Sequence, residues 1–134
     1  MSGAIVVSEN GGPEVLQWVE RDPGDPGPRQ VRVRHVAVGL NFIDVYHRTG
    51  LYPIELPFTP GVEGAGVVEA VGDGVDDLAV GMRVAYTSNG PIGSYCESRV
   101  LDRARVVPLP DEISEEIAAA IMNLYAAQRG RAAE

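Results

Sequence analysis

Short apolar segments separated by glycine- and proline-rich turns dominate the chain up to residue 110. Within several of them, apolar and polar positions alternate as they do in half-buried β-strands. The pattern predicts six strands, over residues 4–7, 15–20, 30–40, 61–71, 82–87 and 94–100. The segment 21–29, RDPGDPGPR, is typical of a turn between strands and is too short for an interdomain linker. We therefore expect a mainly β, minor-helix (α+β) fold of the partly open barrel type.

The strand over residues 30–40 carries an internal change of pattern. Val31 and Val33 share one face, whereas Val36, Val38 and Leu40 take the opposite parity. A parity switch near His35 predicts a β-bulge or a bend, which barrel strands often need.

Two segments indicate helices. Residues 41–49 break the strand pattern, with Asn41 as a good N-cap and Gly50 as a residue that can end a helix of about two turns. A terminal helix is predicted to follow Ser114 and to end near Gly130. The apolar face of this helix consists of Ile117, Ile121 and Leu124. No later segment of the sequence is expected to cover that face.

Composition excludes several kinds of chemistry. The chain has 134 residues, enough for one domain, and all 11 of its basic side chains are arginines, so no lysine can form a Schiff base or bind phosphate. The net charge of −8 argues against a nucleic-acid surface. The longest apolar run is far below the roughly 20 residues that span a bilayer, and no secretory signal is visible. A cytoplasmic protein without membrane or nucleic-acid partners is expected.

The glycine clusters do not fit a dinucleotide fingerprint. The segment 61–66, GVEGAG, has the wrong spacing and runs into a strand. Gly72 and Gly74 are followed by an acidic pair, Asp76 and Asp77, which would repel phosphate. These glycines are interpreted as turn and packing residues, and the chain has no phosphate cradle.

Metal and nucleophile chemistry find little support. His35, His47 and Cys96 are not paired at a metal-ligand spacing. Cys96 is the single cysteine, which excludes an intrachain disulfide, and its neighbour Glu97 does not favour a thiolate. The histidines are interpreted as solvated or core-edge residues and Cys96 as a buried thiol.

Residues 41–53, NFIDVYHRTGLYP, gather more functional groups than any other segment. An amide, a carboxylate, an arginine and two tyrosines lie around one helical turn. Asn41 and Asp44 could be capping residues only, and Tyr46 and Tyr52 could be amphipathic aromatics at a rim. The residues by themselves leave a structural and a functional role open.

Several stretches in order resemble the N-terminal, GroES-like catalytic domain of the medium-chain dehydrogenase/reductase superfamily. The closest branch is the zinc-independent NADPH:quinone oxidoreductases, the relatives of zeta-crystallin. The stretches that carry the resemblance, which runs through roughly residues 3 to 122, are GGPEVL (11–16), VGLNFIDVY (38–46), RTGLYP (48–53), PGVEGAGVV (60–68) and VGMRVAY (80–86). The resemblance implies a GroES-like domain over residues 1–122 and a tail, 123–134, that departs from the family.

Departures from the zinc-dependent branch are chemically specific. Asn41 stands where the zinc enzymes have a cysteine ligand, and Val62, beside Glu63, stands where they have a histidine. The short stretch 89–95 replaces their four-cysteine zinc lobe. Because an amide and a valine cannot replace thiolate and imidazole as zinc ligands, the resemblance implies a mechanism without metal.

The resemblance also implies roles for residues in the 41–53 segment. Asn41, Phe42, Asp44 and Tyr46 would face NADPH, with Tyr46 beside both nicotinamide and substrate as the catalytic contact, and Tyr52 would line the substrate mouth. The family's Rossmann-type domain, which binds most of the cofactor, is expected after the terminal helix, but the sequence reaches Glu134 without its fingerprint. We therefore expect a catalytic domain that is inactive without such a domain.

Three functional hypotheses follow. The first is the substrate-side domain of an NADPH-dependent quinone oxidoreductase. The second is a non-catalytic GroES-like binding or oligomerisation module, and the third keeps the enzyme class but changes the quinone for another small electrophilic acceptor, an enone or 2-alkenal. Self-association as a homo-oligomer is expected because the terminal helix and any unpaired sheet edge need covering.

Overall fold

The computed structural model describes residues 1–87 and 91–122, which form two antiparallel sheets and two helices of more than one turn. β1 (Ser2–Val7) and β2 (Leu16–Arg21) form a two-stranded sheet. The second sheet has five strands in the order β6-β3-β4-β5-β7. Its strands are β3 (Gln30–Val38), β4 (Glu63–Val71), β5 (Arg83–Thr87), β6 (Ser98–Asp102) and β7 (Val106–Pro108). The mainly β, minor-helix fold expected from the sequence is confirmed.

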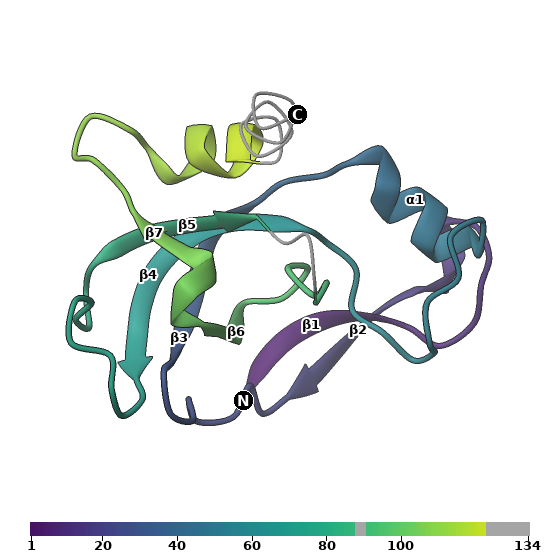
Figure 1. The fold of residues 1–134 in the computed structure, drawn as a ribbon. Coiled ribbons are helices and arrows are strands. Elements are labelled where there is room, and N and C mark those ends of the chain that lie inside the picture. Colours follow the sequence, from purple (N-terminus) through teal and green to yellow (C-terminus); the bar gives the residue numbers. More distant parts are fainter. Residues whose placement is uncertain (88–90, 123–134) are drawn as a thin grey trace, which may run out of the picture.

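Isolated bridges join β1 to two segments that lie between the other strands. Ala4 of β1 pairs with Cys96, and Val7 pairs with Phe58. Figure 1 shows the hairpin of β1 and β2 with helix α1 (Phe42–Thr49) on one side of the molecule, and the curved five-stranded sheet on the other. The segments around Phe58 and Cys96 therefore connect the hairpin to the rest of the chain.

Three apolar clusters hold the layers together. The largest lies inside the curved five-stranded sheet and includes Val31, Val33 and Tyr86. A second joins β4 and β5 to the C-terminal helix through Ala65, Ala85, Ala118 and Ala119. The third, around Val7, Val15 and Phe58, lies under the hairpin of β1 and β2.

The bulge predicted near His35 is confirmed. The register of β3 against β4 shifts between His35 and Ala37, and a second shift follows Arg32. Val33, before the bulge, is fully buried, whereas Val36, within it, is 48% exposed, so the strand leaves the core at the bulge. Gly66 of β4 lies opposite His35, and an added Cβ there would collide with the backbone carbonyl of Arg34. The two backbones therefore approach closely, in agreement with the packing role predicted for this glycine.

Other element predictions need correction. The strand expected over residues 94–100 begins only at Ser98, because the N–H groups of Ser94 and Tyr95 donate to the carbonyls of Gly61 and Pro60 instead of to a neighbouring strand. β7 and the short 3-10 turns η1 (Pro13–Val15) and η2 (Arg103–Arg105) were not predicted from the sequence.

The C-terminal helix begins at residue 115 with the predicted cap. Ser114 Oγ accepts a hydrogen bond from the Ile117 N–H at 3.3 Å. Ala118 and Ala119 pack on the sheet, whereas Ile117 and Ile121 stay exposed, as the uncovered face predicted. Leu124, the expected Gly130 cap and the tail 123–134 lie outside the described residues.

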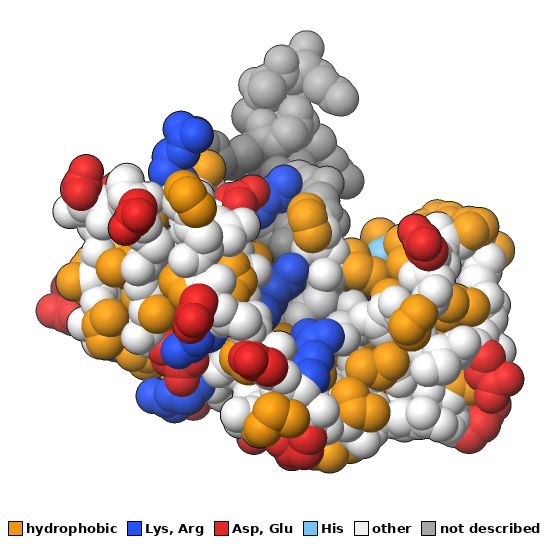
Figure 2. Space-filling model, turned by 90° about the horizontal axis from the view of Figure 1, so that it is seen from below, with side chains coloured by type: hydrophobic (Ala, Val, Ile, Leu, Met, Phe, Trp, Pro, Cys, Tyr) orange, Lys and Arg blue, Asp and Glu red, His pale blue; other side chains and the backbone are white. Residues whose placement is uncertain are grey.

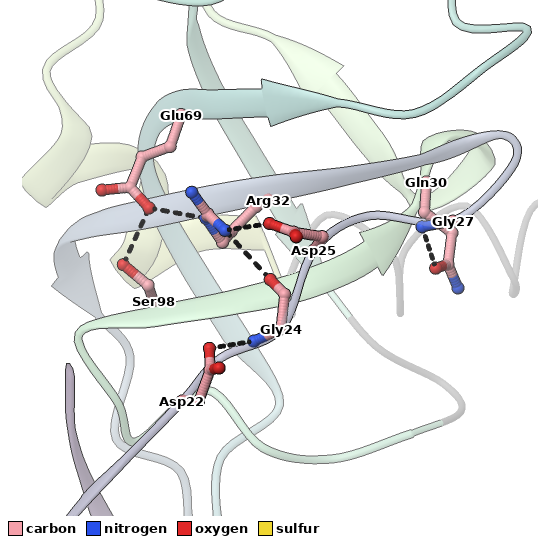
Figure 3. Close-up of polar contacts among 8 residues, drawn as sticks. All are labelled: Asp22, Gly24, Asp25, Gly27, Gln30, Arg32, Glu69 and Ser98. Carbon is pink, nitrogen blue, oxygen red and sulfur yellow. Dashed lines mark hydrogen bonds and ion pairs between the residues drawn. The ribbon is translucent and has the colours of Figure 1, made fainter. Parts of the chain in front are cut away.

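The proline-rich segment 22–29 is fastened to β3 by one arginine (Figure 3). Arg32 donates to the Gly24 carbonyl at 3.0 Å, to Asp25 at 3.1 Å and to Glu69 at 3.1 Å. Asp22 in turn accepts from the Gly24 N–H at 2.9 Å. The segment is thus an ordered turn between strands, as predicted, and not a linker.

Candidate functional site

Helix α1 presents the segment that the sequence singled out. Asn41 caps it with an extended backbone, and Asp44, in the first turn, accepts a hydrogen bond from the Asn41 N–H at 3.0 Å. Gly50 ends the helix with a φ of 83°, a left-handed value that glycine adopts without strain. Both predicted ends of the helix are confirmed, and they fix where residues 41–46 point.

The side chain of Asn41 is held by a buried carboxylate. Its Nδ2 donates to Glu63 Oε1 at 2.7 Å, and Glu63, the first residue of β4, is only 2% exposed. Gly39 makes the room, because an added Cβ there would collide with the Glu63 side chain and the Ala119 carbonyl. Because a carboxylate only accepts hydrogen bonds, this contact determines that the amide nitrogen, and not the oxygen, faces β4.

Asp44 is committed to an internal contact. Tyr95 donates its hydroxyl proton to Asp44 Oδ2 at 2.7 Å, and Asp44 is 4% exposed. Burial, and then the hydrogen bond to Asp44, raise the pKa of Tyr95 well above its usual value. Asp44 therefore fastens the start of α1 to the segment before β6.

Tyr46 and Tyr52 form an aromatic pair. Their ring centroids are 5.2 Å apart and the planes meet at 66°, an edge-to-face arrangement. The Tyr52 N–H donates to the Tyr46 carbonyl at 3.1 Å, which holds the chain after the helix against it. Half of Tyr52 is exposed, so the pair presents a polar-edged aromatic surface to solvent.

A hollow of about 380 Å³ opens at the start of α1. We call it the α1 hollow. It is lined by the apolar side chains of Leu16, Leu40, Phe42 and Val45 together with Asn41 and Asp44. The structure thus brings Asn41, Phe42 and Asp44 together, while Tyr46 and Tyr52 lie outside its lining. Leu40 and Phe42 are each about four-fifths exposed, at 80% and 81%, so this is an apolar surface with fixed polar groups.

The histidine of β3 and the cysteine occupy structural positions. His35 Nδ1 lies 2.6 Å from the Cys96 carbonyl, which only accepts, so Nδ1 carries the proton and Nε2 accepts from the Tyr86 hydroxyl at 2.7 Å. Burial lowers the pKa of His35 to about 4 and raises the pKa of Tyr86 to about 12. Cys96 is buried, and burial raises the pKa of its thiol, as expected for an inert residue.

The donor set does not fit zinc. Over residues 1–87 and 91–122, no group of three histidine, cysteine or acidic side chains lies close enough together to hold a metal ion. Around Asn41 the potential ligands are an amide and the Glu63 carboxylate that it contacts.

Over residues 1–87 and 91–122, no helix has the length and apolar character needed to cross a membrane.

Sequence reasoning missed Glu63 and Tyr95 as site residues. Glu63 drew attention only as the neighbour of Val62, although a carboxylate at the start of a glycine-rich strand is a signal of a buried polar contact. Tyr95 carried no signal, because its partner lies 51 residues away.

The chain is similar in sequence to one protein family and to several known enzymes. The alcohol dehydrogenase GroES-like domain family matches residues 27–111. The quinone oxidoreductase of Pseudomonas aeruginosa is 54% identical over 123 residues, which are 91% of this chain and 38% of that protein. The 2-haloacrylate reductase of a Burkholderia species is 42% identical over 82% of this chain and 34% of its own length. The chain therefore spans little more than a third of the relatives that it matches.

A solved structure agrees with these sequence similarities. The Escherichia coli quinone oxidoreductase complexed with NADPH superimposes with a TM-score of 0.88 at 40% identity. The match covers 96% of this chain and 41% of the E. coli chain. Fold and sequence identity thus agree over nearly all of this chain.

Proposed function

Because the chain belongs to the alcohol dehydrogenase GroES-like domain family and its relatives include several quinone oxidoreductases, we propose that it is the substrate-side domain of an NADPH-dependent quinone oxidoreductase. The solved E. coli relative carries NADPH, which supports this choice of cofactor. A further nucleotide-binding domain would hold most of the NADPH, because the sequence contains no phosphate-binding glycine fingerprint. The chain alone would therefore be inactive.

The observation that carries the proposal is the contact between Asn41 and Glu63. It fixes an amide at 2.7 Å from a buried carboxylate, on the rim of the apolar α1 hollow. A nicotinamide is a flat apolar ring with one carboxamide, so Phe42 and Val45 suit its ring, and Asn41 suits its carboxamide or the adjoining ribose. Asp44 contributes indirectly, by holding the start of α1 through Tyr95.

In the proposed reaction, the main role of the protein is to position the cofactor and the acceptor. NADPH, when bound, would supply the hydride, and one proton from solvent would complete the reduction of a quinone to a hydroquinone. Tyr46 and Tyr52, whose rings form an edge-to-face pair, would contact the flat acceptor through their aromatic surfaces. Holding donor and acceptor at contact distance then sets the rate.

The mechanism that we propose uses no zinc. Asn41 and Val62 stand at the positions where the resemblance expects zinc ligands, and the described side chains offer no cluster of three donors. Metal analysis of the purified chain tests this directly, since a zinc content near one equivalent per chain would contradict it.

A chimera tests the activity. The chain would replace the corresponding segment of the P. aeruginosa relative, to which it is 54% identical, and NADPH oxidation would be followed with a benzoquinone. We expect turnover from the chimera and none from the isolated chain. Tyr46→Ala should lower kcat/KM by about 100-fold, and Val107→Ala, an exposed residue of β7, should leave it unchanged. Equal turnover by the Tyr46→Ala chimera would refute the role of Tyr46.

Similarity to a 2-haloacrylate reductase favours a second candidate, an enone-type acceptor with an activated carbon–carbon double bond. The same chimera, supplied with 2-chloroacrylate and benzoquinone in parallel, separates the two acceptors by their kcat/KM values.

A third candidate, a non-catalytic binding module, is favoured by the exposed Leu40 and Phe42. It predicts that neither acceptor is reduced.

A further inference from the structure

A second hollow, of about 530 Å³, lies apart from the α1 hollow and shares no lining residue with it. We call it the arginine hollow. It opens between the end of β2, the segment 57–59 and the start of β6, and Arg21 and Arg99 line it. Figure 2 views the molecule from below and shows basic side chains gathered along the middle of that face.

The two guanidinium groups are held in place. Arg21 Nη1 donates to the buried Thr59 hydroxyl at 3.1 Å. Arg99 Nη2 donates to the Pro91 and Ile92 carbonyls at 3.2 and 3.3 Å, and its guanidinium carbon lies 5.5 Å from the centre of the Tyr86 ring. Both arginines are half-buried, so little conformational freedom remains to be lost when a ligand binds.

Neither arginine has a carboxylate partner among the described residues. Four other arginines of the described chain form ion pairs with carboxylates, whereas within the same residues Arg21 and Arg99 form none. Their hydrogen bonds go to neutral oxygens, so neither guanidinium group is in an ion pair with a described carboxylate. Two guanidinium groups without an ion-pair partner beside one hollow are the chemistry that recognises an oxyanion.

Two acidic side chains in or beside the hollow have other hydrogen-bond partners. Asp22 lines the hollow, but its Oδ1 accepts from the Gly24 N–H of its own turn (Figure 3). Ser98, which also lines the hollow, donates its hydroxyl proton to Glu69, and the Glu69 oxygens also contact Arg32 and Arg34. The lining carries two guanidinium groups against the one carboxylate of Asp22, so its net charge is positive, although the whole chain carries −8. Because the Debye length is about 8 Å at physiological salt, the local arginines decide what binds there.

The remaining lining is largely apolar. Val6, Phe58, Ile92 and Val100 face the hollow beside the two arginines. We propose that the arginine hollow is a binding site for a small organic oxyanion, a carboxylate or phosphate group carried on a compact apolar body. The charged group would lie between Arg21 and Arg99, and the apolar body would lie on Phe58 and Val100. This site does not depend on the proposed reductase activity.

Titration with benzoate and with phenyl phosphate tests the site. Two-dimensional NMR of the chain should show saturable shifts at the amides of Arg21, Thr59 and Val100. Benzyl alcohol has the same ring without the charge and should cause none. The ratio of the two affinities tells a carboxylate site from a phosphate site, and either result supports the proposal.

Two variants make the test specific. Arg21→Gln should weaken binding by about tenfold or more, the effect of losing one charge-assisted hydrogen bond. Arg105→Gln removes the same charge from η2, outside the hollow, and should leave the affinity unchanged. Arg99 is kept, because its packing on Tyr86 contributes to the fold.

Three results would overturn the proposal: shifts that do not saturate, shifts that benzyl alcohol reproduces, or an Arg21→Gln variant that has a native-like spectrum and binds as the parent does. None of these readouts uses NADPH, so they leave the reductase proposal untouched.

Discussion

Tyr95 and Asp44 lie 51 residues apart in the chain and are joined by a hydrogen bond of 2.7 Å. The bond connects the segment before β6 to the first turn of α1, where Asp44 also accepts from the Asn41 N–H. One buried carboxylate thereby determines both where the helix starts and where it lies against the barrel. The α1 hollow depends on this contact, since Asp44 and Tyr95 are both in its lining.

Removing the Tyr95 hydroxyl should weaken the site and the fold together. Tyr95→Phe keeps the ring but leaves Asp44 Oδ2 with the Asn41 N–H alone. Because the lost bond has a charged acceptor, we expect a loss of about 1.5–3 kcal/mol in the free energy of unfolding, measured by urea denaturation. Tyr52→Phe changes a half-exposed tyrosine in the same way, and as the matched control it should cost little. An unchanged unfolding midpoint for Tyr95→Phe would show that the contact is not formed in solution.

Changing Glu63 should reveal how Asn41 is positioned. Glu63→Gln retains an oxygen that can accept from Asn41, so we expect a folded chain. In the chimera with the P. aeruginosa relative, it should have a raised KM for NADPH and a nearly unchanged kcat, the effect expected when binding alone is impaired. Glu63→Ala leaves the Asn41 amide without this acceptor and opens space beside Gly39, and should raise the KM further. If kcat falls while the KM is constant, Glu63 has a role other than orienting Asn41.

Acid should destabilise the fold through His35. Its pKa is about 4 in the folded chain and 6.5 when the side chain is fully hydrated, mainly because burial disfavours the charged form. Between these two pH values the unfolded chain binds a proton that the folded chain does not, so stability is lost as the pH falls from 6.5 toward 4. The full loss from this residue is at most about 3 kcal/mol.

Urea unfolding measured across that pH range checks the prediction. His35→Gln should flatten the dependence, because glutamine can still contact the Cys96 carbonyl and the Tyr86 hydroxyl but does not titrate. An equally steep slope in this variant would assign the acid sensitivity to other groups.

The C-terminal helix should be held by a bidentate ion pair. Arg83 of β5 contacts both carboxylate oxygens of Glu115, at 2.8 and 3.0 Å, and the hydrogen bonds from Arg83 lower the pKa of Glu115 to about 2. The stabilisation from Glu115 is therefore present above pH 4.5 and is lost as the pH falls toward 2. Hydrogen exchange at the amides of Ala118 and Ala119 should accelerate in Glu115→Gln. It should not do so in Glu112→Gln, an exposed residue before the helix. Equal exchange in both variants would contradict the role of the pair.

Local sequence features predicted helix α1 and the bulge of β3, although they did not predict the 3-10 turns η1 and η2. The ends of α1 follow from Asn41 and Gly50, because caps act over one helical turn. The bulge near His35 follows from a parity change within one strand. The predicted start of β6 was wrong because residues 94–95 have the composition of a strand, while their N–H groups pair with Gly61 and Pro60, more than 30 residues away.

The same distinction holds for the sites. By itself, the sequence determined that this chain is a mainly β GroES-like domain, that residues 41–53 concentrate its polar chemistry, and that it has no lysine and one cysteine. Only the tertiary structure decided that Glu63 orients Asn41, that Tyr95 fastens Asp44, and that Arg21 and Arg99 share a hollow. Residue type and spacing fix what a side chain can do, whereas its partners depend on how strands distant in sequence are folded against one another, and no local pattern contains that information.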